Sequence, residues 1–375
     1  MPTTLLHVFP TFAIGGQQTR FATIANRLGP AIRHRLISLD GCAEAAALLD
    51  RTLDFDLLSS PSHNVSILRR LRTIAKVSAE VHADILVTYN WGAIEWAFVN
   101  RWSRARPHIH LEDGFGLDEA DRQKPHRVLA RRLTLQRSTL LVPSRNLAEI
   151  ACTHWKLRPQ NVTYIPNGID PGRFDRLPTD GNPHFQCVPA TCTIGSFSPL
   201  RPEKNIRRLL EAFAELAKSH SAIRLVICGD GPERNYLQEF AKGLGIAERV
   251  NFVGHVKSPE TVMGQFDLFA MTSDTEQMPY AVLEAMAASR AIVATAVGDI
   301  PTMVAEENRP FIVRRDDRQQ LVNALAQLSQ DASLRRRLGR ANRRRVERSF
   351  PIEQMADAFQ RTIVSLISSR RAMRA

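Results

Sequence analysis

Short apolar runs alternate with longer amphipathic stretches along most of this chain. In the first half, the runs are a few residues long and the stretches between them carry apolar residues at helical spacing. The runs are Leu5–Phe9, His34–Ser38, Ile85–Thr88, Ile109–Leu111, Leu140–Pro143 and Val162–Ile165. The amphipathic stretches include Gln18–Leu28, Ile67–His82 and Val128–Leu135. This alternation predicts parallel β-strands connected by α-helices that cover both faces of a sheet.

The same pattern begins again after residue 190. The second series of runs and stretches comprises Thr193–Phe197, Ile206–Ser219, Arg224–Cys228, Glu233–Leu244, Val250–Val253, Leu268–Thr272 and Ala291–Thr295. Between the two series, Leu177–Pro189 carries three prolines and few apolar residues, which is typical of a linker. We therefore predict an α/β protein with two doubly wound parallel-sheet domains, residues 1–176 and 190–345, in preference to one large α/β domain.

The last segment, residues 346–375, carries a separate pattern. Apolar residues recur at helical spacing between Phe350 and Arg370 and form one apolar face. Such a helix must pack on another part of the protein. We predict that it crosses back to the N-terminal domain.

The composition agrees with this prediction and narrows the class of protein. Among the 375 residues, 44% are hydrophobic and 23% are charged, which supports folded domains and excludes a mainly disordered chain. No stretch approaches the roughly 20 apolar residues that span a bilayer. The N-terminus lacks the leader typical of a secretory signal, and the five cysteines are scattered. We therefore expect reduced thiols and a cytoplasmic location.

The charge favours anionic partners. The formal net charge is +12, which suits nucleic acid, acidic lipid or phosphorylated ligands. Within Arg122–Arg137, six basic residues are interleaved with apolar ones, so this stretch predicts a basic amphipathic helix. Two interpretations are open for it, an anionic membrane surface or a solvated helix face. A second basic run, Arg335–Arg348, is more polar and predicts a solvated face.

Two pairs of residues follow predicted strands and suit a phosphate group. Gly15 and Gly16 precede a helix, where glycine lets backbone N–H groups approach a ligand and the helix N-terminus adds positive potential. A tight turn without a ligand is the alternative. Arg201 and Lys204 lie at a loop-to-helix junction, where they would neutralise a diphosphate and stabilise a phosphate leaving group. In so basic a chain, an unrelated surface pair is the alternative.

The segment Ser273–Ala287 holds two carboxylates. Glu276 falls in the loop after an apolar strand, and Glu284 falls in the next helix. Ionised carboxylates accept hydrogen bonds from several hydroxyl groups, so the pair predicts a ligand rich in hydroxyls. Free N–H groups at the start of this helix would also suit an anion. The alternative is a helix-terminal charge and a solvated face, although the apolar neighbours of Glu284 make an idle carboxylate there costly.

These motifs occur in an order that resembles glycosyltransferase family 4. The matching segments are Gly15-Gly16, Val142-Pro143-Ser144, Ile165–Asp170, Arg201–Asn205, Gly229–Pro232, Phe252-Val253-Gly254 and Glu276 with Glu284. The resemblance spans almost the whole chain and implies the GT-B fold, in which two Rossmann-like domains face a cleft. It also implies retaining transfer of a sugar from a nucleotide-sugar donor to a glycan or lipid-linked acceptor, in cell-envelope polysaccharide or glycolipid synthesis. Neither an essential metal ion nor another cofactor is expected.

The resemblance implies roles for individual residues. The donor-binding set comprises Gly15, Gly16, Gly229, Gln277, Met278, Pro279 and Glu284. The catalytic set comprises Glu276, Arg201, Lys204, Asp113 and Glu112. Within these sets, Glu276 would hold donor-sugar hydroxyls, Glu284 would hold the ribose, and Arg201 with Lys204 would stabilise the leaving nucleoside diphosphate. For Gly229, turn geometry alone is a sufficient explanation.

Two segments depart from the family pattern. Gln277 stands where the family commonly has glycine, which would alter the donor-sugar pocket. Ser198-Pro199-Leu200 stands where the family commonly has Gly-Arg-Leu. Arg201 is therefore the candidate to supply the missing positive charge.

The N-terminal domain is expected to face the acceptor. The residues expected on this side are Tyr89, Asn90, Trp91 and His110. Many relatives carry a histidine near the reacting sugar after the corresponding strand, and here either Glu112 or Asp113 would contact the donor sugar or the acceptor. Trp91 would stack on an acceptor sugar, with a core aromatic as the alternative.

The main hypothesis is a glycosyltransferase at the cytoplasmic face of a membrane. Two alternatives are a basic nucleic-acid-binding protein and another GT-B enzyme, such as a nucleotide-sugar epimerase. The net charge alone motivates the first, and since no nucleic-acid-binding motif accompanies it, we expect no nucleic-acid partner.

Overall fold

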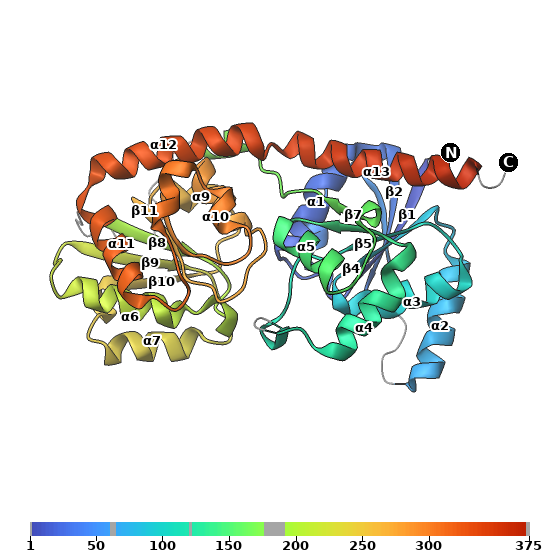
Figure 1. Ribbon diagram of the computed structural model, residues 1–375, viewed down its shortest axis with the longest axis horizontal. Helices are drawn as coiled ribbons and strands as arrows, with labels where there is room; N and C mark the ends of the chain where they lie inside the picture. Colours follow the sequence, from blue (N-terminus) through green and yellow to red (C-terminus); the bar gives the residue numbers. More distant parts are fainter. Residues whose placement is uncertain (1, 61–64, 120–121, 176–191, 373–375) are drawn as a thin grey trace. The chain divides into compact units, whose positions relative to one another are not determined.

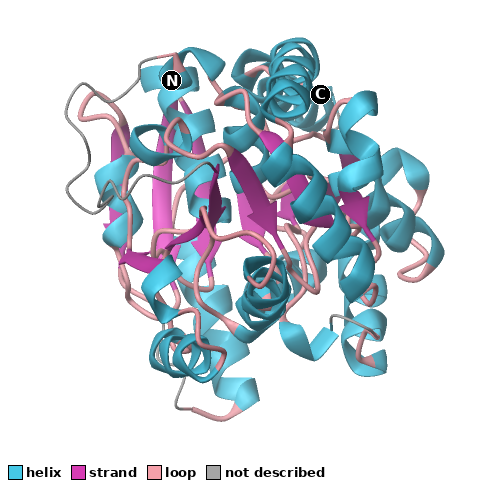
Figure 2. Cartoon of the chain, turned by 90° about the vertical axis from the view of Figure 1, so that its left-hand side faces the viewer, coloured by secondary structure: helices cyan, strands magenta, loops and turns pink. Residues whose placement is uncertain are grey.

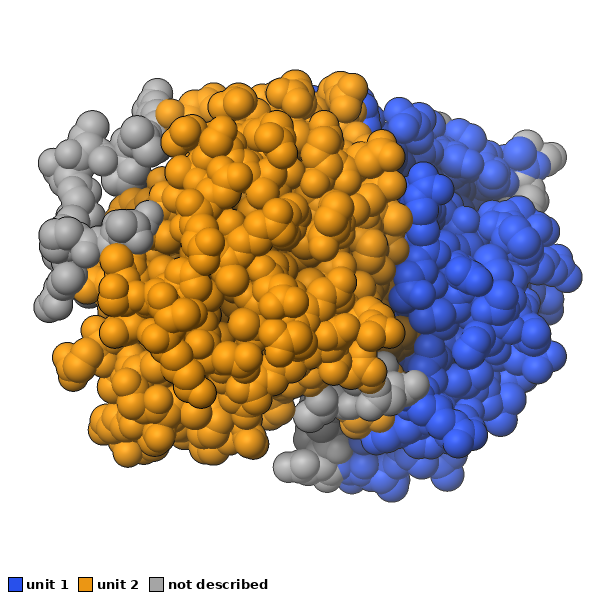
Figure 3. All heavy atoms as spheres, turned by 60° about the vertical axis from the view of Figure 1, so that its left-hand side comes forward, with its two compact units in different colours: residues 1–114, 121–168, 352–375 blue, residues 115–120, 169–351 orange. Residues whose placement is uncertain are grey.

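The computed structural model describes residues 2–60, 65–119, 122–175 and 192–372 of the chain. It divides into two compact units (Figure 3). Unit 1 comprises residues 1–114, 121–168 and 352–375, and unit 2 comprises residues 115–120 and 169–351. The predicted linker 177–189 lies outside the described residues. The boundaries predicted at 176, 190 and 345 stay predictions.

Unit 1 is built on a parallel sheet with strand order β3-β2-β1-β4-β5-β6-β7 in its described residues. The strands are β1 Thr3–Phe9, β2 Ile32–Ser38, β3 Asp54–Leu58, β4 Ile85–Tyr89, β5 His108–Leu111, β6 Thr139–Val142 and β7 Val162–Tyr164. The helices are α1 Gly16–Leu28, α2 Ile67–Glu80, α3 Ile94–Ser103, α4 Pro125–Thr134, α5 Arg145–Thr153 and α13 Ile352–Ala372. The strand order reverses between β1 and β4, and α/β sheets bind ligands at the carboxyl ends of strands beside such a reversal.

Alternation along β1 assigns its side chains to two cores. Leu5 and Phe9 belong to the core that includes residues of α1 and α13, whereas Leu6 and Val8 belong to the core with residues of α2 and α3 (Figure 1). The apolar face predicted for the tail is that of α13, which packs on α1. In the described part of the chain, no helix is both long and apolar enough to cross a membrane.

Unit 2 has the strand order β10-β9-β8-β11-β12-β13, again with parallel pairing in its described residues. The strands are β8 Cys192–Phe197, β9 Ile223–Cys228, β10 Val250–Gly254, β11 Leu268–Met271, β12 Ala291–Thr295 and β13 Ile312–Val313. The helices are α6 Ile206–Ala217, α7 Arg234–Gly243, α8 Glu260–Met263, α9 Tyr280–Ala287, α10 Ile300–Met303, α11 Arg318–Gln330 and α12 Ala332–Ser349. Helices flank the strands (Figure 2). This is the strand order of a Rossmann fold, with its reversal between β8 and β11.

The edge strand β3 was not among the predicted strands. Its sequence alternates aspartate with apolar residues, and the aspartates pair with arginines of β2: Arg33 with Asp54 at 2.6 Å and Arg35 with Asp56 at 2.6 Å. Such cross-strand ion pairs stabilise an edge strand. Because the aspartates interrupt the apolar residues, this segment also lacks the apolar run by which a strand is recognised in the sequence.

Candidate active site

Two loops of unit 2 are hydrogen-bonded to each other where the strand order of its sheet reverses. Asn205, after β8, donates through Nδ2 to Oδ2 of Asp274, after β11, at 2.9 Å. The backbone N–H of Asp274 donates to the carbonyl of Glu203 at 2.8 Å, and Arg208 pairs with Asp274 at 2.7 Å. Because the contacts involve both backbone and side chains, the loops are fixed relative to each other.

This joint brings Lys204 and Glu276 together. The Lys204 Nζ atom lies 2.6 Å from Oε1 of Glu276, and Ser273 Oγ donates to the same oxygen at 2.8 Å. The two side chains are only 18% and 10% exposed. Both of these contacts are made through Oε1 of Glu276. A cation and a carboxylate that can accept several hydrogen bonds therefore lie side by side at the edge where α/β sheets bind ligands.

Arg201 and Gly229 have different roles in this region. Arg201 is exposed and forms no ion pair within the described residues. Gly229 has φ 142°, and a Cβ atom there would lie 1.9 Å from the carbonyl oxygen of Ser198. The glycine is therefore required by the close packing of its turn against the segment that leads to Arg201.

The loop after Glu276 is held by a glycine that was not predicted. Gly298 has φ 54°, and a Cβ atom there would lie 2.3 Å from the carbonyl oxygen of Glu276. The next residue, Asp299, donates its backbone N–H to the carbonyl of Gln277 at 2.9 Å. Gln277 and Met278 are buried, and Pro279 precedes the first residue of α9. The side chain that replaces the usual glycine thus lies in the interior.

Glu284 lies in α9 and is partly exposed. The pKa of this carboxyl is raised to about 7, chiefly by its partial burial, while Arg173 acts to lower the pKa and Glu260 acts to raise it. Perturbed carboxyl groups of this kind are common at binding sites. Within the described residues, no cluster of three or more His, Cys, Asp and Glu side chains is arranged to hold a metal ion.

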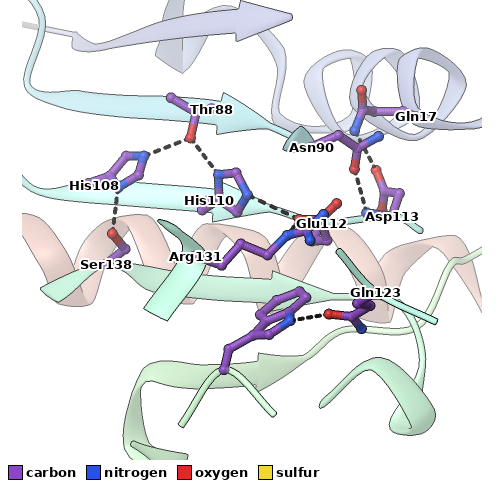
Figure 4. Close-up of polar contacts among 11 residues, drawn as sticks. Gln17, Thr88, Asn90, His108, His110, Glu112, Asp113, Gln123, Arg131 and Ser138 are labelled. Carbon is purple, nitrogen blue, oxygen red and sulfur yellow. Dashed lines mark hydrogen bonds and ion pairs between the residues drawn. The ribbon is translucent and has the colours of Figure 1, made fainter. Parts of the chain in front are cut away.

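In unit 1, Asp113 is held by the helix that follows the glycine pair. Arg20 Nη1 lies 2.8 Å from Oδ1 of Asp113, and Gln17 Nε2 donates to Oδ2 at 3.1 Å. The backbone N–H of Asp113 donates to Oδ1 of Asn90 at 2.8 Å (Figure 4). Arg20 is buried and also donates to the carbonyl of Ile165 at 2.8 Å. Two side-chain contacts and one backbone hydrogen bond thus fix Asp113, whose carboxylate remains 15% exposed.

Those contacts bring Asp113 near the N-terminus of α1. Gly15 caps this helix and Gly16 is its first residue, and no side chain caps its first turn. The predicted glycine pair and the predicted carboxylate therefore meet at one helix end. Gln17 and Arg20, which hold the carboxylate, were not predicted. The sequence signal that could have identified them is an amide side chain and a guanidinium side chain three residues apart, directly after a glycine turn.

Glu112 points to the opposite face of the sheet. It is fully buried, its Oε2 accepts from Arg131 Nε at 3.1 Å, and His110 Nε2 lies 3.6 Å from the same oxygen (Figure 4). Arg131 in turn lies over the rings of Trp91 and Trp155, at 5.2 and 4.9 Å from their centroids. Of the two adjacent carboxylates, Asp113 is therefore the one that a ligand reaches without rearrangement.

His110 and Tyr89 lie in the core rather than at the surface. Thr88 Oγ1 hydrogen-bonds to His108 Nε2 at 2.8 Å and to His110 Nδ1 at 2.7 Å (Figure 4). Tyr89 stacks on Phe9 and its hydroxyl hydrogen-bonds to a buried histidine. The structure thus leaves only Asn90 and Trp91 of the predicted acceptor residues beyond the end of β4.

Comparison with known proteins identifies both units. A family model described as Glycosyltransferase Family 4 matches residues 14–173, and one described as Glycosyl transferases group 1 matches residues 192–345. A D-inositol 3-phosphate glycosyltransferase of Stackebrandtia nassauensis is 29% identical over 282 residues, 68% of this chain and 62% of that protein. An N-acetyl-alpha-D-glucosaminyl L-malate synthase of Bacillus anthracis is 28% identical over 210 residues, 56% of this chain and 55% of that protein.

A solved structure shows the same fold. The Anabaena protein HepE, crystallised with UDP, covers 97% of this chain and 100% of its own, with a TM-score of 0.81 and 18% identity. The two sequence relatives, by contrast, are matched over 62% and 55% of their length. The two family models, which match successive parts of the chain, agree with the fold shared with HepE. The chain belongs to glycosyltransferase family 4 and has the GT-B fold.

Proposed function

We propose that this chain transfers a sugar from a nucleotide-sugar donor to a hydroxyl group of a glycan or lipid-linked acceptor, in cell-envelope polysaccharide or glycolipid synthesis. The anomeric configuration of the donor sugar is retained. The observation that carries the proposal is the Lys204–Glu276 pair, held by joined loops at the reversal of the unit 2 sheet. The UDP bound by HepE makes UDP-sugars the first donors to test.

The proposed reaction exchanges one bond at the anomeric carbon for another. The bond to the diphosphate oxygen breaks, a bond to the acceptor oxygen forms, and the proton of the acceptor hydroxyl leaves with the diphosphate. Negative charge develops on the diphosphate, where Lys204 and Arg201 stabilise it. Glu276 accepts hydrogen bonds from donor-sugar hydroxyls, and Asp113 contacts the donor sugar or the acceptor. Because two cations supply the charge, we expect no essential metal ion.

A screen of UDP-, GDP- and ADP-sugars by thermal shift tests the donor. A true donor at one hundred times its Kd should raise the melting temperature by about 5 °C or more. Product formed from that donor in the presence of EDTA, with its anomeric configuration read by NMR, tests the remaining claims. The proposal is wrong if no sugar nucleotide stabilises the protein, and retention is wrong if the product is inverted.

The affinity for the donor should depend on the ionisation of Glu284. A carboxylate that accepts hydrogen bonds from ribose hydroxyls must be ionised, and its pKa before binding is about 7. Donor affinity should therefore rise up to about tenfold per pH unit below pH 7 and level off above it. Glu284→Gln should bind weakly with little change across this range. Calorimetry with a sugar nucleotide between pH 6 and about 8 measures both, and affinity that falls as pH rises would contradict the assignment.

A further inference from the structure

Two neighbouring helices of unit 1 expose large apolar side chains. They are Phe98 and Trp102 of α3 and Leu129 and Leu133 of α4, which are 38%, 72%, 54% and 59% exposed. The Phe98 and Trp102 rings are 5.9 Å apart, and α3 packs against α4. We call these four residues the α3–α4 ridge. Soluble surfaces rarely gather so many large apolar side chains without a partner.

Two exposed arginines lie close in sequence to residues of the ridge. Arg104, which follows α3, and Arg132 of α4 are exposed, and neither forms an ion pair within the part of the chain described. Glu95 is the single acidic residue in the sequences of α3 and α4, and it pairs with Arg70 of α2 at 2.5 Å. A partner of this surface therefore needs apolar groups and negative charge together.

The other basic run of the chain has a different character. Helix α12 exposes Arg336, Arg337 and Arg340, and none of the exposed large apolar side chains of the described residues lies on it. It has the solvated face that its sequence predicts. The two basic segments therefore form an internal comparison, because both carry charge and only one carries an apolar ridge.

We propose that the α3–α4 ridge docks on an anionic lipid bilayer. Its apolar side chains enter the interfacial layer, where tryptophan is favoured, while Arg104 and Arg132 meet acidic headgroups. A nucleic acid would use the arginines but would leave Leu129 and Leu133 without a partner, whereas a bilayer satisfies both. This surface goes beyond the proposed function, because it does not depend on which sugar is transferred.

Sedimentation of the full chain with lipid vesicles tests the surface without nucleotide or acceptor. The protein should bind phosphatidylcholine vesicles containing about one-third phosphatidylglycerol and should bind pure phosphatidylcholine vesicles about tenfold less. The double variants Phe98→Ser/Trp102→Ser and Arg104→Glu/Arg132→Glu should each lower the partition coefficient about tenfold or more. All four side chains are exposed, so circular dichroism should be unchanged.

Two matched double variants serve as controls. Tyr236→Ser/Val364→Ser removes comparably exposed apolar side chains elsewhere, and Arg336→Glu/Arg337→Glu makes the same change in net charge on α12. Both should bind vesicles like the parent protein. Equal losses from both charge reversals would overturn the proposal in favour of diffuse attraction by the net charge. Unchanged binding of the serine variant would overturn it as well.

Tryptophan fluorescence gives an independent readout of insertion. Trp96 and Trp155 are buried, Trp91 is partly buried, and Trp102 is the exposed member of the four. Vesicles with brominated acyl chains should quench the parent protein, and most of this quenching should be lost in Trp102→Phe. The proposal is overturned if brominated lipid does not quench the tryptophan fluorescence. It is also overturned if an oligonucleotide releases the bound protein while the Phe98→Ser/Trp102→Ser variant binds vesicles like the parent. A third contrary result is a dimer of the parent protein in the absence of lipid, with the Phe98→Ser/Trp102→Ser variant monomeric.

Discussion

Lys204→Ala is expected to lower kcat by about two to three orders of magnitude, with a much smaller change in KM for the donor. The ammonium group lies 2.6 Å from Glu276 and is largely shielded from water. In the proposed reaction, negative charge develops on the leaving diphosphate, and a fixed cation in a shielded site stabilises it more than water does. Steady-state kinetics with a donor found by thermal shift measure the effect.

The exposed lysine at the end of the next helix supplies the control. Lys218→Ala removes a cation from the end of α6 and should leave kcat unchanged. Because Lys204→Ala also removes the ion-pair partner of Glu276, its melting temperature must be measured beside the kinetics. A folded Lys204→Ala enzyme whose kcat stays within about threefold of the parent would contradict the assigned role.

Unit 1 is expected to lose several kcal/mol of stability between pH 7 and pH 5. Burial lowers the pKa of His7 and His108 well below the usual range and that of His34 to about 4. The unfolded chain takes up these protons near pH 6.5. Below that pH the unfolded state binds protons that the native state excludes, so stability falls until the native groups titrate. At pH 5, His34 alone costs about 2 kcal/mol, a large share of the stability of a domain, and His7 and His108 act in the same direction.

The distribution of tryptophan makes this measurement specific. All four tryptophans belong to unit 1, so fluorescence during denaturant unfolding reports on that unit alone. His34→Gln should reduce the pH dependence by up to about 1.4 kcal/mol per pH unit between pH 4 and about 6.5. His154→Gln, which replaces an exposed histidine, is the control substitution. A stability that is level from pH 7 to 5 would show that these histidines are not excluded from protonation.

The sequence indicated the architecture wherever a strand is buried on both faces. Most strands of both sheets appear as compact apolar runs, because helices cover both sides of a parallel sheet. The edge strands β3 and β13 do not follow this rule. The first presents aspartates to the arginines of β2, and the second has only two residues. Neither gives the periodic signal on which such predictions depend.

The candidate site could be predicted where its residues are close in sequence to a strand end. Lys204 and Glu276 follow β8 and β11, which pair with each other, so topology alone brings their loops together. Gln17 and Arg20 could not be assigned, because their partner Asp113 lies far along the chain. Tyr89 shows a different limit: it is the last residue of β4, and alternation turns it inward while the next residues leave the sheet.

Because α13 follows unit 2 in the sequence, the two units are completely translated at different times during synthesis. Met355, Phe359 and Ile363 complete the same core that α1 enters, although the whole of unit 2 separates these helices in the sequence. On the ribosome, unit 2 is fully translated before α13 emerges. The unit that is started first is therefore finished last, and its nascent core stays uncovered while the later unit folds. That interval exposes apolar surface to chaperones and to aggregation.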